Sequence, residues 1–160
     1  MKMNRIHIIF IGLGLLTMMI CVALFAIYLV PLSQRIAADP TYAYLSFMRV
    51  PVLVICEVLA GLFFIALLFG LLMLLRLLRN QTFTPQSVFL LKSIGFIFFL
   101  MIAPLVVLVI YTQIHVSGSI TNFYCIMCAG LCFTGGHLFY LFADLFQQAM
   151  QFKTELDFTV

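Results

Sequence analysis

Residues 50–78, VPVLVICEVLAGLFFIALLFGLLMLLRLL, form the stretch that decides the fold class of this chain. Its charged residues are one acid, Glu57, and one base near its end, Arg76. A helix rises about 1.5 Å per residue, so about 20 apolar residues cross a hydrocarbon core about 30 Å thick. The stretch is therefore predicted to be a membrane-spanning helix, long enough to tilt or to project beyond the bilayer.

The composition of the whole chain agrees with that prediction. Of its 160 residues, 66% are hydrophobic and 8% are charged, whereas a soluble domain has about 25% charged residues. Three further apolar segments complete a set of spans predicted at about residues 6–30, 50–78, 88–112 and 121–143. The first apolar core exceeds the roughly 7–15 residues of a cleaved signal. We expect a single-domain, all-α integral membrane four-helix bundle that is surrounded by the lipid bilayer.

Lysine and arginine residues gather on one side of these spans, which predicts the orientation of the chain. Cytoplasmic segments carry an excess of both residue types. One side bears Lys2, Arg5, Arg76, Arg79, Lys92 and Lys153. The other side bears only Arg35 and Arg49. Both termini are therefore predicted to be cytoplasmic.

Local signals predict where individual helices begin and end. Thr84 followed by Pro85 is a helix-start pattern, in which a hydroxyl cap precedes proline at the first helical position. Pro31 predicts the end of the first span, followed by a short interfacial helix over residues 33–39. The fourth helix is expected to continue beyond the membrane as an amphipathic extension in the cytoplasmic tail, residues 144–160.

Two segments resemble a known family of bacterial membrane proteins. Residues 83–95, FTPQSVFLLKSIG, are similar to a family loop that reads Phe-Ser, an Asn three positions later, then Val, Leu, a basic residue and Ile-Gly. Ser87 stands where that family has Asn, and the tail ELDFTV, residues 155–160, resembles its Glu-x-Asp-Leu-Thr-Val ending. The family is domain of unknown function 2975. The resemblance implies a small four-span protein of the bacterial inner membrane, and a regulatory role, because members often neighbour small helix-turn-helix regulators.

Three of the five cysteines, Cys125, Cys128 and Cys132, lie close together in the fourth span. Their i, i+3, i+7 spacing places them with Gly136 on one helical stripe, which predicts a surface where a neighbouring helix packs. The Cys125–Cys128 pair also fits a quinone-linked thiol oxidoreductase, although the predicted outer loops lack cysteines that could relay electrons. No Cys/His set has zinc-ligand spacing, and we expect neither a metal nor another cofactor.

Glu57 is the most unusual residue of the spans, because acids within a bilayer are costly and usually face the bundle interior or water. It is a candidate proton or cation site, or a structural hydrogen-bonding group. Its candidate partners are Thr112, Gln113, Asn122 and Tyr124. His137 is expected to be a buried, hydrogen-bonded structural residue, with a functional role as the alternative. Asp144 is expected to form an ion pair with a basic residue at the inner boundary.

The leading functional hypothesis is a non-enzymatic regulatory protein that binds a cytoplasmic partner, such as a helix-turn-helix transcription regulator. Its candidate partner-binding residues lie in the inner loop and the tail: Arg79, Phe83, Thr84, Ser87, Lys92, Glu155, Asp157 and Phe158. The alternative is a small transporter or channel subunit that uses Glu57, as a homo-oligomer. The sequence contains no catalytic motif and no basic run that would indicate direct nucleic-acid binding.

Overall fold

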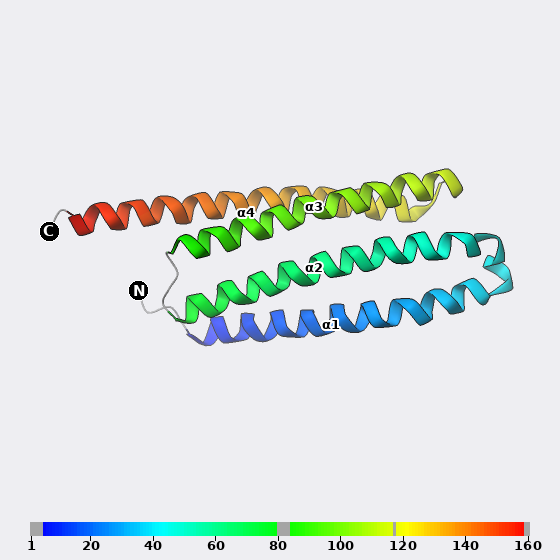
Figure 1. The fold of residues 1–160 in the computed structure, drawn as a ribbon, viewed down its shortest axis with the longest axis horizontal. Helices are drawn as coiled ribbons and strands as arrows, with labels where there is room; N and C mark the ends of the chain where they lie inside the picture. Colours follow the sequence, from blue (N-terminus) through cyan, green and yellow to red (C-terminus); the bar gives the residue numbers. More distant parts are fainter. Residues whose placement is uncertain (1–4, 80–83, 117, 159–160) are drawn as a thin grey trace.

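The computed structural model describes residues 5–79, 84–116 and 118–158. The elements in these ranges are α1 (Arg5–Ala38), the 3₁₀ helix η1 (Pro40–Met48), α2 (Arg49–Leu78), α3 (Pro85–His115) and α4 (Ile120–Phe158) (Figure 1). No strand occurs within the described ranges. The all-α prediction is confirmed, with four long helices that are compatible with a bundle.

Helices that follow one another in the chain pack side by side: α1 on α2, α2 on α3, and α3 on α4 (Figure 1). Within the described residues, the backbone of α1 does not contact that of α3 or α4, so the helices form a series. We name the two ends of this series by what they carry. The η1 end carries η1 and the α3–α4 connection, and the terminal end carries both termini and the α2–α3 connection (Figure 1).

All four long helices are long and apolar enough to cross a membrane: Ile6–Ala38, Tyr44–Leu78, Pro85–His115 and Ile120–Phe152. They make the chain a candidate multi-pass membrane protein. A helix can cross the lipid core because its backbone N–H and C=O groups bond to each other within the helix, where no water is present to bond them. Of the most apolar stretch in each helix, 28% is buried in α3 but only 6% in α1. The third helix is therefore the centre of the packing, and α1 presents most of its side chains outward.

The closest approach is between α3 and α4, where two glycines face each other. A Cβ atom added to Gly95 would lie 2.8 Å from the Tyr140 ring and 3.0 Å from the carbonyl oxygen of Gly136. A Cβ atom added to Gly136 would lie 3.0 Å from the Phe99 ring and 3.2 Å from the carbonyl oxygen of Gly95. Small residues let helix backbones meet in this way, which is a common form of helix packing in lipid.

The predicted helix ends are confirmed at one proline and wrong at another. The third helix begins at Pro85, and the Thr84 side chain accepts the backbone N–H of Ser87, as the cap pattern predicts. Pro31, however, lies inside α1, which continues to Ala38, so no separate helix begins at Ser33. A proline removes only one backbone hydrogen bond, and the chain continues as a helix around it. The turn is made instead by Asp39, whose carboxylate accepts the Thr41 N–H at 2.9 Å.

Candidate functional site

Glu57 lies on α2, eight positions after the helix begins at Arg49. Its Oε1 atom is buried and has no hydrogen-bond partner within the described part of the chain. Helical spacing places it on a different side of α2 from Val52, Ile55 and Leu59, which pack into the α2–α3–α4 core. Burying a carboxyl oxygen without a hydrogen-bond partner is unfavourable, so Glu57 is the most unusual polar residue of α2.

Two of the four polar residues suggested as partners for Glu57 bond to each other instead. Asn122 Nδ2 donates to Gln113 Oε1 at 2.6 Å, which links the first turns of α4 to the last turns of α3. The Oδ1 atom of Asn122 is buried and without a partner among the described residues. Thr112 is also buried, and Tyr124 is exposed. The η1-end half of the molecule therefore holds two buried oxygen acceptors, on α2 and α4, that the described side chains do not satisfy.

The cysteine stripe of α4 is divided by the structure. Cys125 and Cys132 are buried against Leu105 and Leu108 of α3, and Gly136 meets Gly95 in the same interface. Cys128 is exposed, so the prediction that it shares this interface is corrected. A helix turns about 100° per residue, so Cys132 and Gly136, at i+7 and i+11, lie almost in line with Cys125. Cys128, at i+3, falls at the edge of that stripe. The five cysteines are all free thiols, so Cys125 and Cys128 form no disulfide here.

His137 is exposed rather than buried, which corrects the expectation from the sequence. Its ring packs edge-on against the rings of Phe99, at 5.0 Å, and Phe133, at 4.6 Å. The neighbours of this imidazole are thus aromatic faces and edges instead of the polar partner that was predicted. Within the ranges described, no group of three or more His, Cys, Asp or Glu side chains is placed to hold a metal ion.

The terminal end holds the ion pair that the sequence predicted. Lys92 Nζ lies 3.8 Å from Asp144 Oδ1, and it donates to Gln147 Oε1 at 3.5 Å. These contacts join the second turn of α3 to α4. Arg76 of α2 donates to Gln86 of α3, so polar bonds at this end connect three consecutive helices. Arg79 is exposed at the end of α2.

The family model described as "Protein of unknown function (DUF2975)" matches residues 33–160. The chain belongs to this family. No curated protein and no solved structure matches the chain. The function of this family is unknown, so membership assigns no activity to any residue of the chain.

The loop motif that resembles the DUF2975 family pattern has a structural role at the start of α3. Ser87 is fully buried, and its hydroxyl lies 3.0 Å from Thr84 Oγ1. Val88 and Leu91 pack against Ala143 of α4, which is also fully buried. Phe83 lies outside the described residues. So do the side chains of Glu155, Asp157 and Phe158, although the helical backbone reaches Phe158.

Sequence reasoning missed one feature of this DUF2975 protein, a cavity at the η1 end. Its walls come from the end of α1, from η1, from the start of α2 and from the α3–α4 connection. Ser33 and Arg49 are bonded to each other there, although 16 positions separate them. In the sequence, the signal for this site is a basic residue, Arg49, at the beginning of an apolar span. The sequence does not show that Arg49 lies beside Ser33, because the reversal of the chain through η1 brings the two residues together.

Proposed function

We propose that this DUF2975 protein is a non-enzymatic regulator in the bacterial inner membrane, with the terminal end in the cytoplasm. There it binds a cytoplasmic protein, such as a helix-turn-helix transcription regulator, through the α2–α3 connection and the end of α4. The orientation is supported by the excess of Lys and Arg at this end, which is typical of cytoplasmic segments.

The observation that carries the proposal is the length of α4 and the way it packs. This helix has 39 residues, whereas about 20 cross a bilayer. Phe146 and Met150 pack with Val88 and Leu91 of α3, beyond the point where Lys92 meets Asp144. The exposed side of the same turns carries Gln147, Gln148 and Gln151, a polar surface on a helix that is anchored to the bundle.

Through this packing, a bound partner would respond to the arrangement of α3 and α4 in the membrane domain. A protein bound to the end of α4 and the start of α3 contacts two helices whose spacing is set by Gly95 and Gly136. A change in the α3–α4 crossing would move the two halves of that surface relative to each other. Binding that favours one spacing over the other would couple the partner to the bundle, because a partner shifts an equilibrium only through different affinities for its states.

Co-purification from bacterial membranes in mild detergent, followed by mass spectrometry, tests the proposal. A chain that ends at residue 150 keeps the packed part of α4 and removes the remaining tail. We expect it to lose a cytoplasmic partner that the full chain retains. Replacement of exposed Arg35, at the η1 end, by Gln is the control and should retain the partner. Equal recovery with the full and the shortened chain would contradict the role of the tail.

The buried Oε1 of Glu57 favours a second candidate function, a small transporter or channel subunit in which this carboxyl binds a proton or a cation. Such residues in spans usually serve ion pathways or pair with another group. Glu57→Gln preserves the shape of the side chain and removes its charge, so it should abolish ion or proton flux in liposomes. Asp39→Asn, an acid outside the spans, is the control and should leave the flux unchanged. Unaltered flux in Glu57→Gln would reject this function.

A further inference from the structure

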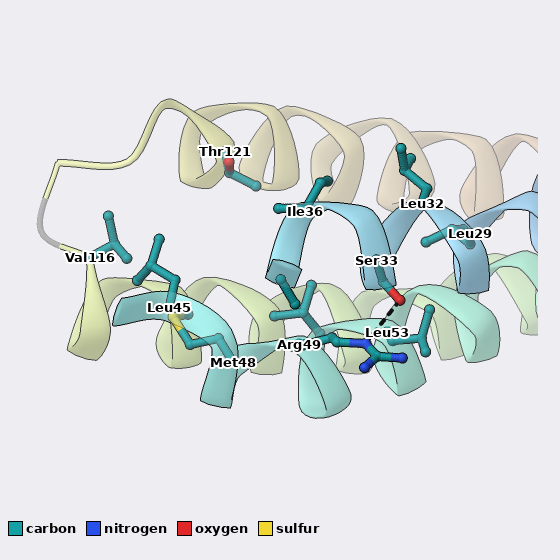
Figure 2. A pocket seen from close by; sticks show the side chains of 12 residues that line it. Leu29, Leu32, Ser33, Ile36, Leu45, Met48, Arg49, Leu53, Val116 and Thr121 are labelled. Atoms are coloured by element: carbon teal, nitrogen blue, oxygen red, sulfur yellow. Dashed lines mark hydrogen bonds between the residues drawn. The ribbon is translucent and has the colours of Figure 1, made fainter. Parts of the chain in front are cut away.

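The cavity at the η1 end has a volume of about 430 Å³. That size is within the range of about 300–1,000 Å³ that is typical of small-molecule sites. Figure 2 shows aliphatic side chains of α1, η1 and α2 around it, with Val116 and Thr121 from the opposite side. Leu29, Leu32 and Ile36 of α1 face Leu45, Met48 and Leu53 across the space (Figure 2). Such walls fit an alkyl chain better than a polar solute, because they offer almost no hydrogen bonds.

Arg49 is the one charged residue among those that line the cavity. Its Nε donates to Ser33 Oγ at 3.3 Å (Figure 2). Ser33 in turn donates to the carbonyl oxygen of Val30 at 2.7 Å. A guanidinium group has five N–H donors, so the Nε bond leaves the donors of both terminal nitrogens. The Ser33 bond holds the side chain of Arg49 at the cavity instead of letting it extend freely into solvent.

No carboxylate of the described residues pairs with Arg49. The ion pair that the structure records, between Lys92 and Asp144, lies at the terminal end. Glu57 is the nearest acid in the sequence, eight positions along α2, and forms no ion pair with Arg49. Asp39 lies ten positions before Arg49, and its carboxylate accepts the N–H of Thr41. That bond lowers the pKa of Asp39, and it directs the carboxylate to its own turn. Among the described residues, Arg49 therefore forms no ion pair with a carboxylate.

Arg49 also lies inside an apolar segment, Tyr44–Leu78. A cation at the edge of the bilayer is stabilised by an anion of matching geometry, and a guanidinium binds phosphate oxygens in pairs. From the charge, the apolar walls and the volume, we infer that the cavity binds an acidic phospholipid of the surrounding leaflet. The lipid phosphate lies on the terminal nitrogens of Arg49. The first part of one acyl chain fills the space between α1 and α2.

This site is independent of the proposed function, because it lies at the opposite end of the helices from the terminal end. It gives a reason for the cavity: the described side chains leave a space that a lipid fills. It also assigns a role to η1, which supplies Leu45 and Met48 to one wall.

Native mass spectrometry of the detergent-purified full chain tests the inference, with phosphatidylglycerol and phosphatidylcholine added at equal concentration. The unaltered chain should retain phosphatidylglycerol preferentially. Arg49→Gln should reduce that retention by about tenfold or more, since a charge-assisted hydrogen bond is lost. Arg35→Gln removes the same charge from an exposed position at the same end, outside the cavity lining, and should change retention less than about twofold.

A second variant tests the acyl-chain part of the site and does not depend on the first. Ala37→Phe adds a ring to the cavity wall while Arg49 is kept, and it should also reduce phosphatidylglycerol retention. Inorganic phosphate at the same concentration should not raise the melting temperature of the protein, whereas phosphatidylglycerol should. The inference is overturned if Arg35→Gln and Arg49→Gln lose equal retention, if phosphatidylcholine is retained equally, or if phosphate alone stabilises the protein as well as the lipid does.

Discussion

The α3–α4 seam, where Gly95 meets Gly136, and the α1–α2 contact both join long apolar helices, yet they differ in how closely the backbones approach. At the seam, Gly95 and Gly136 bring backbone within reach of backbone. Between α1 and α2, a Cβ atom added to Gly12 would lie 3.0 Å from Leu74, and one added to Gly70 would lie 3.9 Å from Leu15. Both neighbours are the flexible ends of side chains and not backbone. Gly14 of α1 and Gly61 of α2 have nothing within 4 Å.

The difference shows what holds helices together when lipid is the solvent. Lipid tails are as apolar as leucine, so burying leucine between helices gains little from the hydrophobic effect. Close packing and hydrogen bonds supply the preference instead. The α3–α4 pair has both, since glycine contact lies between the Gln113–Asn122 bond and the Lys92–Asp144 pair. The first helix has the lowest burial and is held mainly by α2.

The largest effect is expected from adding a methyl group at the seam. Gly95→Ala places a Cβ atom against the Tyr140 ring and the Gly136 carbonyl, at 2.8 and 3.0 Å. Overpacking of this kind costs about 1–3 kcal/mol. Gly61→Ala, with open space around it, should be neutral or stabilising by up to about 1 kcal/mol, because alanine is the better helix former. Equilibrium unfolding in detergent measures the change in the free energy of unfolding for both variants. Equal changes would contradict the conclusion that the α3–α4 seam is packed more closely than the surroundings of Gly61.

A second test compares two leucines. Leu108 is 6% exposed in the α2–α3–α4 core, and Leu24 of α1 is 60% exposed. Leu108→Ala should cost about 1–2 kcal/mol, less than in a water-soluble core, because lost packing contributes but transfer from water does not. Leu24→Ala should change the free energy of unfolding by less than about 0.5 kcal/mol. A larger cost for Leu24→Ala would show that α1 is packed against something besides α2.

The start of α3 offers a third test, with two threonines. Thr84→Ala removes the side chain that accepts the N–H of Ser87, and loss of such a cap costs about 1 kcal/mol. Among the described residues, Thr134 of α4 donates to the carbonyl oxygen of Gly130 within its own helix, at 3.0 Å. Thr134→Ala should therefore be close to neutral. Thermal unfolding of the two variants tests whether the Thr84 cap stabilises the start of α3 and with it the α3–α4 seam. Indistinguishable melting temperatures would contradict that role of the cap.

The smallest effect is expected from the ion pair at the terminal end. The side chains of Lys92 and Asp144 are 42% and 62% exposed, so solvent screens their attraction. A double-mutant cycle with Lys92→Gln and Asp144→Asn should give a coupling of about 0.2–0.5 kcal/mol that falls with added salt. A coupling above about 1 kcal/mol at high salt would mean that the seam is closed by this pair as well as by the glycines.

The cysteines show how far helical spacing carries a prediction. The periodicity of Cys125, Cys132 and Gly136 predicted a packing surface, and all three lie in the α3–α4 interface. Cys128 has a compatible spacing and is exposed. The width of a contact stripe depends on the angle at which the neighbouring helix crosses, and that angle cannot be read from the sequence of one helix.

His137 and Pro31 illustrate two other limits. Helical spacing places Phe133 beside His137, four positions apart on α4. The sequence does not show that Phe99 also packs there, because Phe99 lies on α3. Pro31 was predicted to end a helix that in fact continues to Ala38. One missing hydrogen bond is a local cost, and a helix tolerates it where the flanking turns are stable.

The sequence alone determined the number of long apolar helices, the beginning of α3 at Pro85 and the family to which the chain belongs. These depend on hydropathy, length and short motifs, which are properties of neighbouring residues. Only the tertiary structure decided that Gly95 meets Gly136, that Cys128 leaves the interface, and that Ser33 holds Arg49 at a cavity. Each of these is set by which face of one helix meets another, and that choice is made by packing between segments that are distant in the chain.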